Sequence, residues 1–206
     1  DSNAEDTSAV YDIARHTVAA FYVDAGDKAT WRSGLVTALA DVDDGDDSPV
    51  MALGAAVWAL AKTGAVDGTP VDSGASPGSL WDGVTLGDLP AMLAGEQAPD
   101  GSFYTKFDHN QGYGYTETTA LGGLGLIAAH ADNPSLGYED EIYDARLVLA
   151  GGVDTGGEVY WKIGDSGQPQ YYFAAGETLE VIPEPGVMSI LAISAMAFLA
   201  RRRRKG

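Results

Sequence analysis

The chain contains no cysteine and few basic residues. Without cysteine it can form no disulfide, no thiolate nucleophile and no zinc-thiolate site, so its stability has to come from packing, alone or with a bound ion. This absence does not settle the compartment, because many exported bacterial proteins also lack disulfides. At 206 residues the chain has room for one ordinary domain and a tail.

Basic residues are scarce outside the C-terminal end. Five of the 12 Lys and Arg residues occupy positions 201–205, so residues 1–182 hold seven basic residues against 29 acidic ones, which leaves a net charge of −22. Such a body repels phosphate backbones and anionic lipid and attracts divalent cations. The charge argues against nucleic-acid binding. An acidic surface that only keeps an exported protein soluble is the simplest explanation.

The N-terminal segment "DSNAEDTS" has no apolar core of the kind that signal peptides contain. We interpret it as a mature terminus left by signal cleavage, or as an arbitrary boundary of the chain. Export therefore has to be inferred from the other end.

The last 24 residues combine three features in a fixed order: Pro183, Glu184 and Pro185, an apolar run over residues 187–200, and a basic cluster. The prolines hold the backbone extended. The run of 14 residues would reach about 21 Å as a helix, short of the roughly 30 Å hydrocarbon core, so it spans a membrane only with help from flanking residues. The cluster would stay cytoplasmic and leave the body across the inner membrane. It consists of Arg201, Arg202, Arg203, Arg204 and Lys205.

This tripartite end resembles the PEP-CTERM sorting signal. The resemblance implies that an inner-membrane exosortase recognises the tail and cleaves near the motif, in a Gram-negative, often biofilm-forming bacterium that makes exopolysaccharide. The protein would be exported, transiently anchored in the inner membrane, and then located on the cell surface or outside the cell. An ordinary tail anchor with a basic stop-transfer end is the alternative. We divide the chain into an exported acidic domain, residues 1–182, and a sorting signal, residues 183–206, with a transmembrane helix over the apolar run.

Residues 1–182 are predicted to be mainly α-helical. Apolar residues recur at helical spacing, Ser48 before Pro49 is a typical helix start, and Gly64 is a typical stop. Residues 65–83 are rich in Gly, Ser, Pro and Asp, which predicts a long loop. The predicted helices span residues 8–23, 28–40, 49–63, 86–97, 116–130 and 139–150.

Two internal matches indicate a repeated unit. The segment "ALGAAVWALAKTG" from Ala52 matches "ALGGLGLIAAHAD" from Ala120, and "GSFYTKF" from Gly101 matches "GEVYWKI" from Gly157. The matches predict about three helix-hairpin repeats with short β-strands at the turns. The predicted units cover residues 28–63, 86–130 and 139–182, and the first would be capped by residues 8–23.

The second unit contains "LAGEQAPDGSF", residues 93–103, which resembles the QW motif of the terpenoid cyclase and prenyltransferase superfamily, with Phe where the family usually has Trp. The resemblance implies a mainly α fold, a partial alpha/alpha toroid in which the Gln and the aromatic residue tie helix ends together. It supports the fold rather than an activity. The match is carried by Gln97, Asp100, Gly101, Ser102 and Phe103. Small residues in the following helix would let helices approach closely: Gly122, Gly123 and Gly125.

An acidic run over residues 41–47 contains "DVDD", which resembles the DxDD proton-donor motif of class II terpene cyclases. Three hairpins make only a partial toroid, without the deep apolar cavity that this chemistry needs, so we do not expect cyclase activity. A calcium site is one interpretation, because carboxylate oxygens on a flexible glycine turn suit that ion, although the spacing is not that of an EF-hand. A solvated acidic turn without any cofactor is the other. The carboxylates are Asp41, Asp43, Asp44, Asp46 and Asp47.

Aromatic residues gather after the two matched "GSFYTKF" and "GEVYWKI" segments, beside amides and other hydrogen-bonding side chains. Flat rings that stack on pyranose faces are typical of a sugar-binding surface. The alternative is that the rings cover the core. The candidate glycan contacts are Tyr104, Tyr113, Tyr115, Trp161, Tyr171 and Tyr172, and the nearby amides are Asn110, Gln111, Gln168 and Gln170.

We therefore predict a non-catalytic, exported surface or extracellular-matrix protein that contacts exopolysaccharide or another surface protein. The alternative is a polysaccharide lyase or hydrolase, since alpha/alpha toroids also host such enzymes. The three histidines are far apart and form no metal set, and no GxSxG elbow supports a serine hydrolase. The candidate catalytic residues are Asp100, Asp108, His109, Tyr115 and Glu117.

Overall fold

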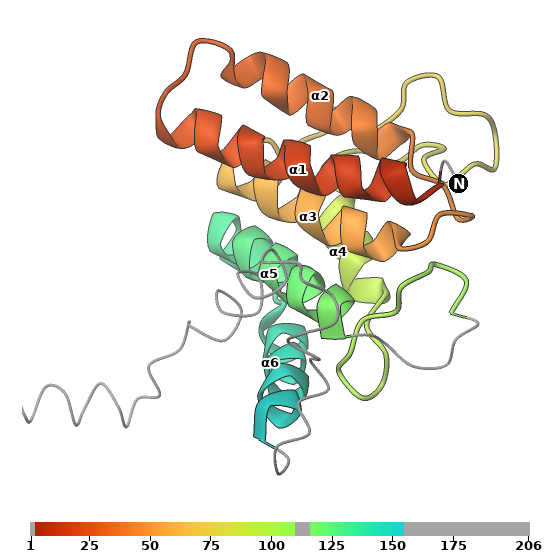
Figure 1. Cartoon of the computed structure of the whole chain (residues 1–206), viewed down its shortest axis with the longest axis vertical. Coiled ribbons are helices and arrows are strands. Elements are labelled where there is room, and N and C mark those ends of the chain that lie inside the picture. Colours follow the sequence, from red (N-terminus) through yellow and green to blue (C-terminus); the bar gives the residue numbers. More distant parts are fainter. Residues whose placement is uncertain (1–2, 110–115, 155–206) are drawn as a thin grey trace, which may run out of the picture.

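The computed structural model describes residues 3–109 and 116–154, and this part of the chain is mainly α-helical, as predicted (Figure 1). The sorting signal and the "GEVYWKI" segment lie outside the described residues. No helix in the described ranges is long and apolar enough to cross a membrane. The elements are α1 (Asn3–Tyr22), α2 (Lys28–Ala40), α3 (Pro49–Lys62), α4 (Leu89–Gly95), α5 (Thr116–Asp132), a short 3-10 helix η1 (Pro134–Leu136) and α6 (Glu139–Asp154).

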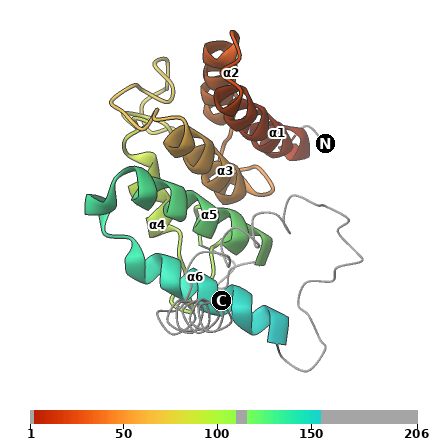
Figure 2. The same cartoon turned by 90° about the vertical axis from the view of Figure 1, so that its left-hand side faces the viewer.

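The helices are stacked in the spatial order α2, α1, α3, α5, α6 (Figures 1 and 2). α1 and α2 form a hairpin at one end of the stack, and α6 lies at the other. α1 packs on both α2 and α3, and α4 packs beside α3 and α5. The most extensive contacts join α3 to α5.

α3 is the central helix of the core. Every residue from Pro49 to Ala61 except Met51 is buried. A helix that is apolar on all sides has to be covered on all sides, and the surrounding helices α1, α2, α4 and α5 do this. The start predicted at Ser48 and Pro49 is confirmed, with Pro49 in the first turn, where its missing N–H costs no hydrogen bond.

The backbones of α3 and α5 approach each other at glycines. A Cβ added at Gly54 would lie 2.8 Å from the carbonyl oxygen of Leu121, and one at Gly125 would lie 2.8 Å from the carbonyl oxygen of Gly54. The ring of Phe103 packs against Gly122, where an added Cβ would lie 2.7 Å from the nearest ring carbons. These contacts confirm that small residues in α5 permit close packing. The two helices are the pair whose sequences match.

The short strand predicted over residues 101–107 does not form. The segment contributes one isolated bridge, between Gln97 and Phe103, and a second isolated bridge joins Pro70 to Thr85. The described residues contain no β-strand. The chain turns back sharply, with the Ala98 N–H donating to the Ser102 carbonyl at 2.7 Å, so pairing ends after one bridge instead of extending into a ladder.

α4 is shorter than predicted at both ends. The N–H and the hydroxyl of Thr85 both donate to the carboxylate of Asp88, at 2.9 and 2.6 Å, so the chain is still in a turn until Leu89. At the other end the carbonyl of Glu96 accepts from the N–H of Tyr104 at 3.1 Å. A turn held by the Asp88 side chain and a returning loop therefore replace the outer turns of the expected helix. α1 instead begins before its predicted start at residue 8 and ends at Tyr22, just short of its predicted end, while α5 and α6 extend beyond their predicted C-terminal ends.

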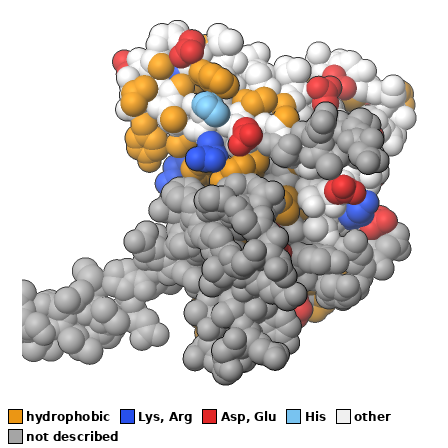
Figure 3. Space-filling view, viewed as in Figure 1, with side chains coloured by type: hydrophobic (Ala, Val, Ile, Leu, Met, Phe, Trp, Pro, Cys, Tyr) orange, Lys and Arg blue, Asp and Glu red, His pale blue; other side chains and the backbone are white. Residues whose placement is uncertain are grey.

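The α1–α2 end of the molecule carries apolar side chains at its surface (Figure 3). Tyr22 and Val23, at the turn between the two helices, are 78% and 76% exposed. The guanidinium of Arg32 lies 4.3 Å from the ring centroid of Phe21, so a basic group covers part of this surface. Single exposed apolar residues are common on soluble domains, and this pair does not define a site by itself.

The long loop over residues 65–83 is anchored by Trp81. The side chain is 3% exposed, and its Nε1 donates to the carbonyl of Val42 at 2.9 Å. We expect Trp81→Phe to lower the free energy of unfolding by about 1–3 kcal/mol, because the buried carbonyl loses its donor and the smaller ring leaves a gap. Urea denaturation followed by circular dichroism measures this loss.

The matched control is Trp31→Phe, whose indole donates to Asp27 at an exposed position. Its cost should be smaller, since water can replace the lost donor. Equal costs for the two variants would show that Trp81 does not anchor the loop.

Candidate functional site

The loop after α4, residues 96–109, is tied to α6. The side-chain amide of Gln97 donates to the carbonyl of Gly101 at 3.0 Å and to the carbonyl of Glu141, in the first turn of α6, at 2.8 Å. Gly101 has φ 86°, and a Cβ there would lie 2.8 Å from the carbonyl oxygen of Asp144. Gln97 thus joins the ends of two helices, which is the role expected of it from the sequence.

Phe103 fixes the same loop to α5. Its side chain is fully buried against Gly122, and its N–H donates to the hydroxyl of Thr119 at 3.0 Å. One further bond joins the loop to the start of α3, where the N–H of Val50 donates to the carbonyl of Thr105 at 3.3 Å. Three helices therefore hold the loop between Gln97 and Thr105, and Tyr104 lies within this stretch.

Glu96, Tyr104 and His109 meet on this loop and form what we call the Glu–His–Tyr cluster. Nε2 of His109 lies 2.7 Å from Oε2 of Glu96. The rings of Tyr104 and His109 are stacked, with centroids 4.4 Å apart and an interplanar angle of 22°. The side chain of Glu96 is 11% exposed and that of His109 is 43% exposed. The cluster thus has a buried acid beneath a partly open pair of rings.

The backbone of His109 is unusual. Its φ of 53° lies in the left-handed region, which few residues with a Cβ adopt. The imidazole ring of His109 contacts both the carboxylate of Glu96 and the ring of Tyr104. Conformations of this kind are concentrated at functional sites, so the backbone and the side chains indicate the same place.

Burial raises the pKa of the Glu96 carboxyl above its ordinary value of 4.5, and it outweighs the hydrogen bond with His109, which acts in the opposite direction. The negative charge of Asp44 raises the pKa further. The acidic run therefore lies within electrostatic reach of the cluster. A buried carboxyl beside a histidine is a pairing that can bind a polar ligand or exchange protons with one.

We expect Glu96→Gln to change how stability depends on pH. Because its pKa is raised in the folded state, the contribution of Glu96 to stability is fully present below pH 4.5 and is lost as the pH rises through the folded-state pKa. Glutamine does not ionise, so the variant does not lose stability in this way. The free energy of unfolding of the variant, minus that of the wild type, should therefore increase as the pH rises above 4.5. Denaturation at a series of pH values measures the difference, and a difference that does not vary with pH would contradict the prediction.

The acidic run forms a turn capped by its own carboxylates. Asp46 is 3% exposed and accepts from the N–H of Asp43 at 3.0 Å, and the carboxylate of Asp43 accepts from the N–H of Gly45 at 2.6 Å. Within the described residues, no group of three or more His, Cys, Asp or Glu side chains is placed to hold a metal ion. The geometry of the run adds no support for the calcium interpretation. The exposed carboxylates of the run are Asp41, Asp43, Asp44 and Asp47.

The other candidate residues have different positions. Asp100 accepts from the hydroxyl and the N–H of Ser102, at 2.5 and 3.0 Å, and these bonds hold the pKa of Asp100 below its ordinary range. Asp108 is exposed and precedes His109. Glu117 lies in the first turn of α5, and among the residues that the structure describes no hydrogen bond or ion pair links it to the cluster. Tyr113, Tyr115, Trp161, Tyr171, Tyr172 and the four nearby amides lie outside the described residues.

Sequence reasoning found His109 and Tyr104 but missed Glu96. Glu96 and His109 are 13 positions apart on a loop. A loop has no regular helical or strand spacing from which such a contact could be predicted. The available signal was local, since Glu96 directly precedes Gln97 in "GEQAPDGS".

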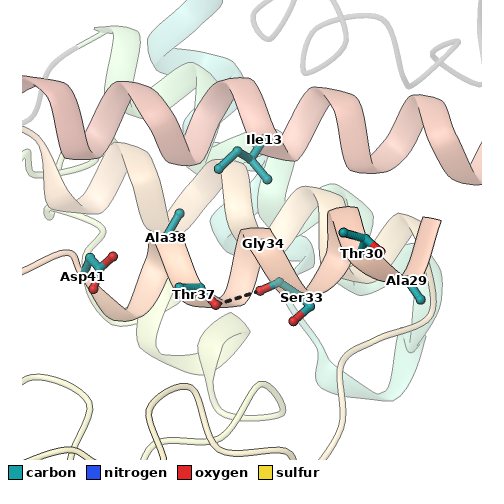
Figure 4. Close-up of a pocket in the computed structure, with 8 residues that line it drawn as sticks. All are labelled: Ile13, Ala29, Thr30, Ser33, Gly34, Thr37, Ala38 and Asp41. Atoms are coloured by element: carbon teal, nitrogen blue, oxygen red, sulfur yellow. Dashed lines mark hydrogen bonds between the residues drawn. The ribbon is translucent and has the colours of Figure 1, made fainter. Parts of the chain in front are cut away.

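A concavity away from the cluster lies between α1 and α2 (Figure 4). It is an open groove of about 640 Å3, and the hydroxyl of Thr37 that lines it donates to the carbonyl of Ser33 in the same helix at 3.1 Å. No aromatic ring lines the groove, and Asp41 is the one predicted site residue there. We therefore place the candidate site at the Glu–His–Tyr cluster. The groove is lined by Ile13, Ala29, Thr30, Ser33, Gly34, Thr37, Ala38 and Asp41.

In comparisons with known proteins, the chain matches no protein-family model, no curated protein and no solved structure. The fold and the site therefore define a mainly helical protein with a buried acid beneath a partly exposed ring stack. Its function has to be argued from these residues and from the tail.

Proposed function

We propose that this chain is an exported, exosortase-sorted bacterial surface or extracellular-matrix protein, whose helical domain contacts glycan without transforming it. The observation that carries the glycan contact is the Tyr104–His109 ring stack held over Glu96. Stacked rings with hydrogen-bonding groups at their edge provide both a stacking surface for a pyranose and partners for its hydroxyls. The acidic body is compatible with export and disfavours nucleic acid as a partner.

The helical units are proposed to form a partial alpha/alpha toroid. Two features support it: the sequence-matched helices α3 and α5 pack face to face, and Gln97 joins the end of α4 to α6. In this arrangement the loops between helices lie at the ends of the hairpins, where a glycan can reach them.

The sorting proposal is supported by the order of Pro183-Glu184-Pro185, the apolar run and the basic cluster. The test is the intact mass of the protein recovered from the surface of its native cells. A species that ends near residues 183–186 is expected, with or without an added adduct. A mass that corresponds to an end at Gly206 would leave an ordinary tail anchor and refute sorting.

The glycan contact is tested by affinity electrophoresis and calorimetry of the full chain with neutral, acidic and amino-bearing polysaccharides. Tyr104→Ala should weaken the binding of an intact glycan about fivefold, because a stacking ring contributes on the order of 1 kcal/mol. Tyr143→Ala removes an exposed ring on α6 and is the matched control. Equal affinities for wild type and Tyr104→Ala would refute the contact at this site.

A second candidate function, a polysaccharide lyase or hydrolase, is favoured by one observation, the buried Glu96 with a raised pKa beside His109. A carboxyl that keeps its proton nearer to neutral pH can act as a general acid. New reducing ends or unsaturated sugars, lost by at least about 100-fold in Glu96→Gln, would support it. Saturable binding without any product would support the non-catalytic function.

A further inference from the structure

Carboxylates border the Glu–His–Tyr cluster on two sides. The charge of Asp44 acts on Glu96, and the exposed Asp108 directly precedes His109. The backbone bond from Val50 to Thr105, the residue after Tyr104, joins the loop to the start of α3, which follows the acidic run in the chain. The rings therefore lie in a field that is set by these carboxylates and not only by the net charge of the body.

Little positive charge opposes this field. Lys106 is the one lysine or arginine in residues 96–109, and its side chain is only half-exposed. A negative potential over a binding surface repels uronate, sulfate and phosphate groups and attracts ammonium groups. An ammonium group near an aromatic ring gains a further attraction from the negative face of the ring.

We propose that the Glu–His–Tyr cluster binds a glycan that carries free amino groups, such as a de-N-acetylated hexosamine polymer. This inference rests on the proposed glycan contact and specifies the class of glycan. The pyranose stacks on the ring pair, and its ammonium group lies toward the exposed carboxylate of Asp44. The carboxylates thus select for charge, while the rings select for the flat face of a sugar.

A metal ion is a poorer fit for the same charge. An ion needs several oxygen or nitrogen ligands converging on one point, and no such group exists among the described residues. An ammonium group needs only one or two acceptors and tolerates a ring as a neighbour. The arrangement of one buried acid, one exposed acid and two stacked rings suits the organic cation.

The experiment compares two oligosaccharides of equal length against the full chain by calorimetry, in mildly acidic buffer where free amines are protonated. The probes are a β-1,4-linked glucosamine hexamer and its fully N-acetylated counterpart. We expect the glucosamine hexamer to bind at least about tenfold more tightly. Added salt should reduce that preference, because it screens the attraction between the ammonium groups and the carboxylates.

Two charge-removing variants locate the preference. Asp44→Asn should reduce the preference for the amino form by at least about threefold, since it removes one negative charge near the cluster without touching the rings. The control is Asp132→Asn, which removes the same charge from an exposed position at the far end of α5. The control should keep the full preference.

The outcomes separate this inference from the proposed function. Equal binding of the two hexamers, weakened alike by Tyr104→Ala, would overturn the amino-sugar inference and leave the glycan contact intact. Binding of neither hexamer nor any other glycan would overturn both. Equally tight binding of a lysine hexamer would overturn the inference too, because it would show attraction to any polycation.

Discussion

Gly54→Ala should lower the free energy of unfolding by about 3 kcal/mol. The added Cβ would lie 2.8 Å from the carbonyl carbon and oxygen of Leu121. These are backbone atoms of α5, so no side-chain rotation can relieve the overlap, and the two central helices have to move apart. Denaturant unfolding followed by circular dichroism measures the loss.

The matched control is Gly34→Ala, in the middle of α2. There the nearest atom to an added Cβ is Cγ2 of Ile13, at 4.0 Å. Alanine favours a helix over glycine by about 0.5–1 kcal/mol, so this variant should be neutral or slightly stabilised. Similar effects of the two substitutions would contradict the close crossing of α3 and α5.

Phe103→Ala should cost about 3–5 kcal/mol, because it removes a fully buried ring and leaves a cavity against Gly122. The loop that carries Tyr104 and His109 would also lose its anchor on α5, so glycan affinity should fall even where the variant remains folded. Unfolding and calorimetric binding under folding conditions measure the two effects. The control is Leu147→Ala, which truncates a half-exposed apolar residue on α6 and should cost much less. A loss below about 1 kcal/mol for Phe103→Ala would show that the ring does not anchor the loop.

Much of the helical fold could be predicted from the sequence. α2 spans the predicted residues, and α3 begins where Ser48 and Pro49 indicate, because local capping and apolar spacing determine these elements. The close approach of α3 and α5 was also predictable from the small residues in their matched segments. In this pair the sequence pattern and the tertiary packing agree.

The errors arose where the chain folds back on itself. The segment over residues 101–107 alternates like a strand, yet within the described ranges its pairing is limited to the bridge with Gln97, and Phe103 fixes it instead. α4 is shortened by the bonds between Thr85 and Asp88. Strand pairing depends on a neighbouring strand, and the start of α4 depends on the side-chain bonds of the preceding turn, so apolar spacing alone could determine neither.

The candidate site was predicted in part. Tyr104 and His109 were candidates from the sequence. Glu96 was recognised only from its contact with His109 in the structure, because no helical or strand period pairs these two positions of the loop. Asp43, Asp46 and Asp100 belong to turns, where each carboxylate accepts from a backbone N–H two or three residues away. Such short spacing between an Asp and the backbone N–H that it accepts from is typical of side-chain-capped turns, and it explains the positions of these three carboxylates.

Hydrogen–deuterium exchange of the full chain, with and without the tighter-binding of the two hexamers, tests the glycan contact most directly. The predicted result is slower exchange concentrated in residues 96–109, with little change along the groove between α1 and α2. Slower exchange confined to that groove, or no change anywhere in the chain under saturating glycan, would contradict a glycan site at Glu96, Tyr104 and His109.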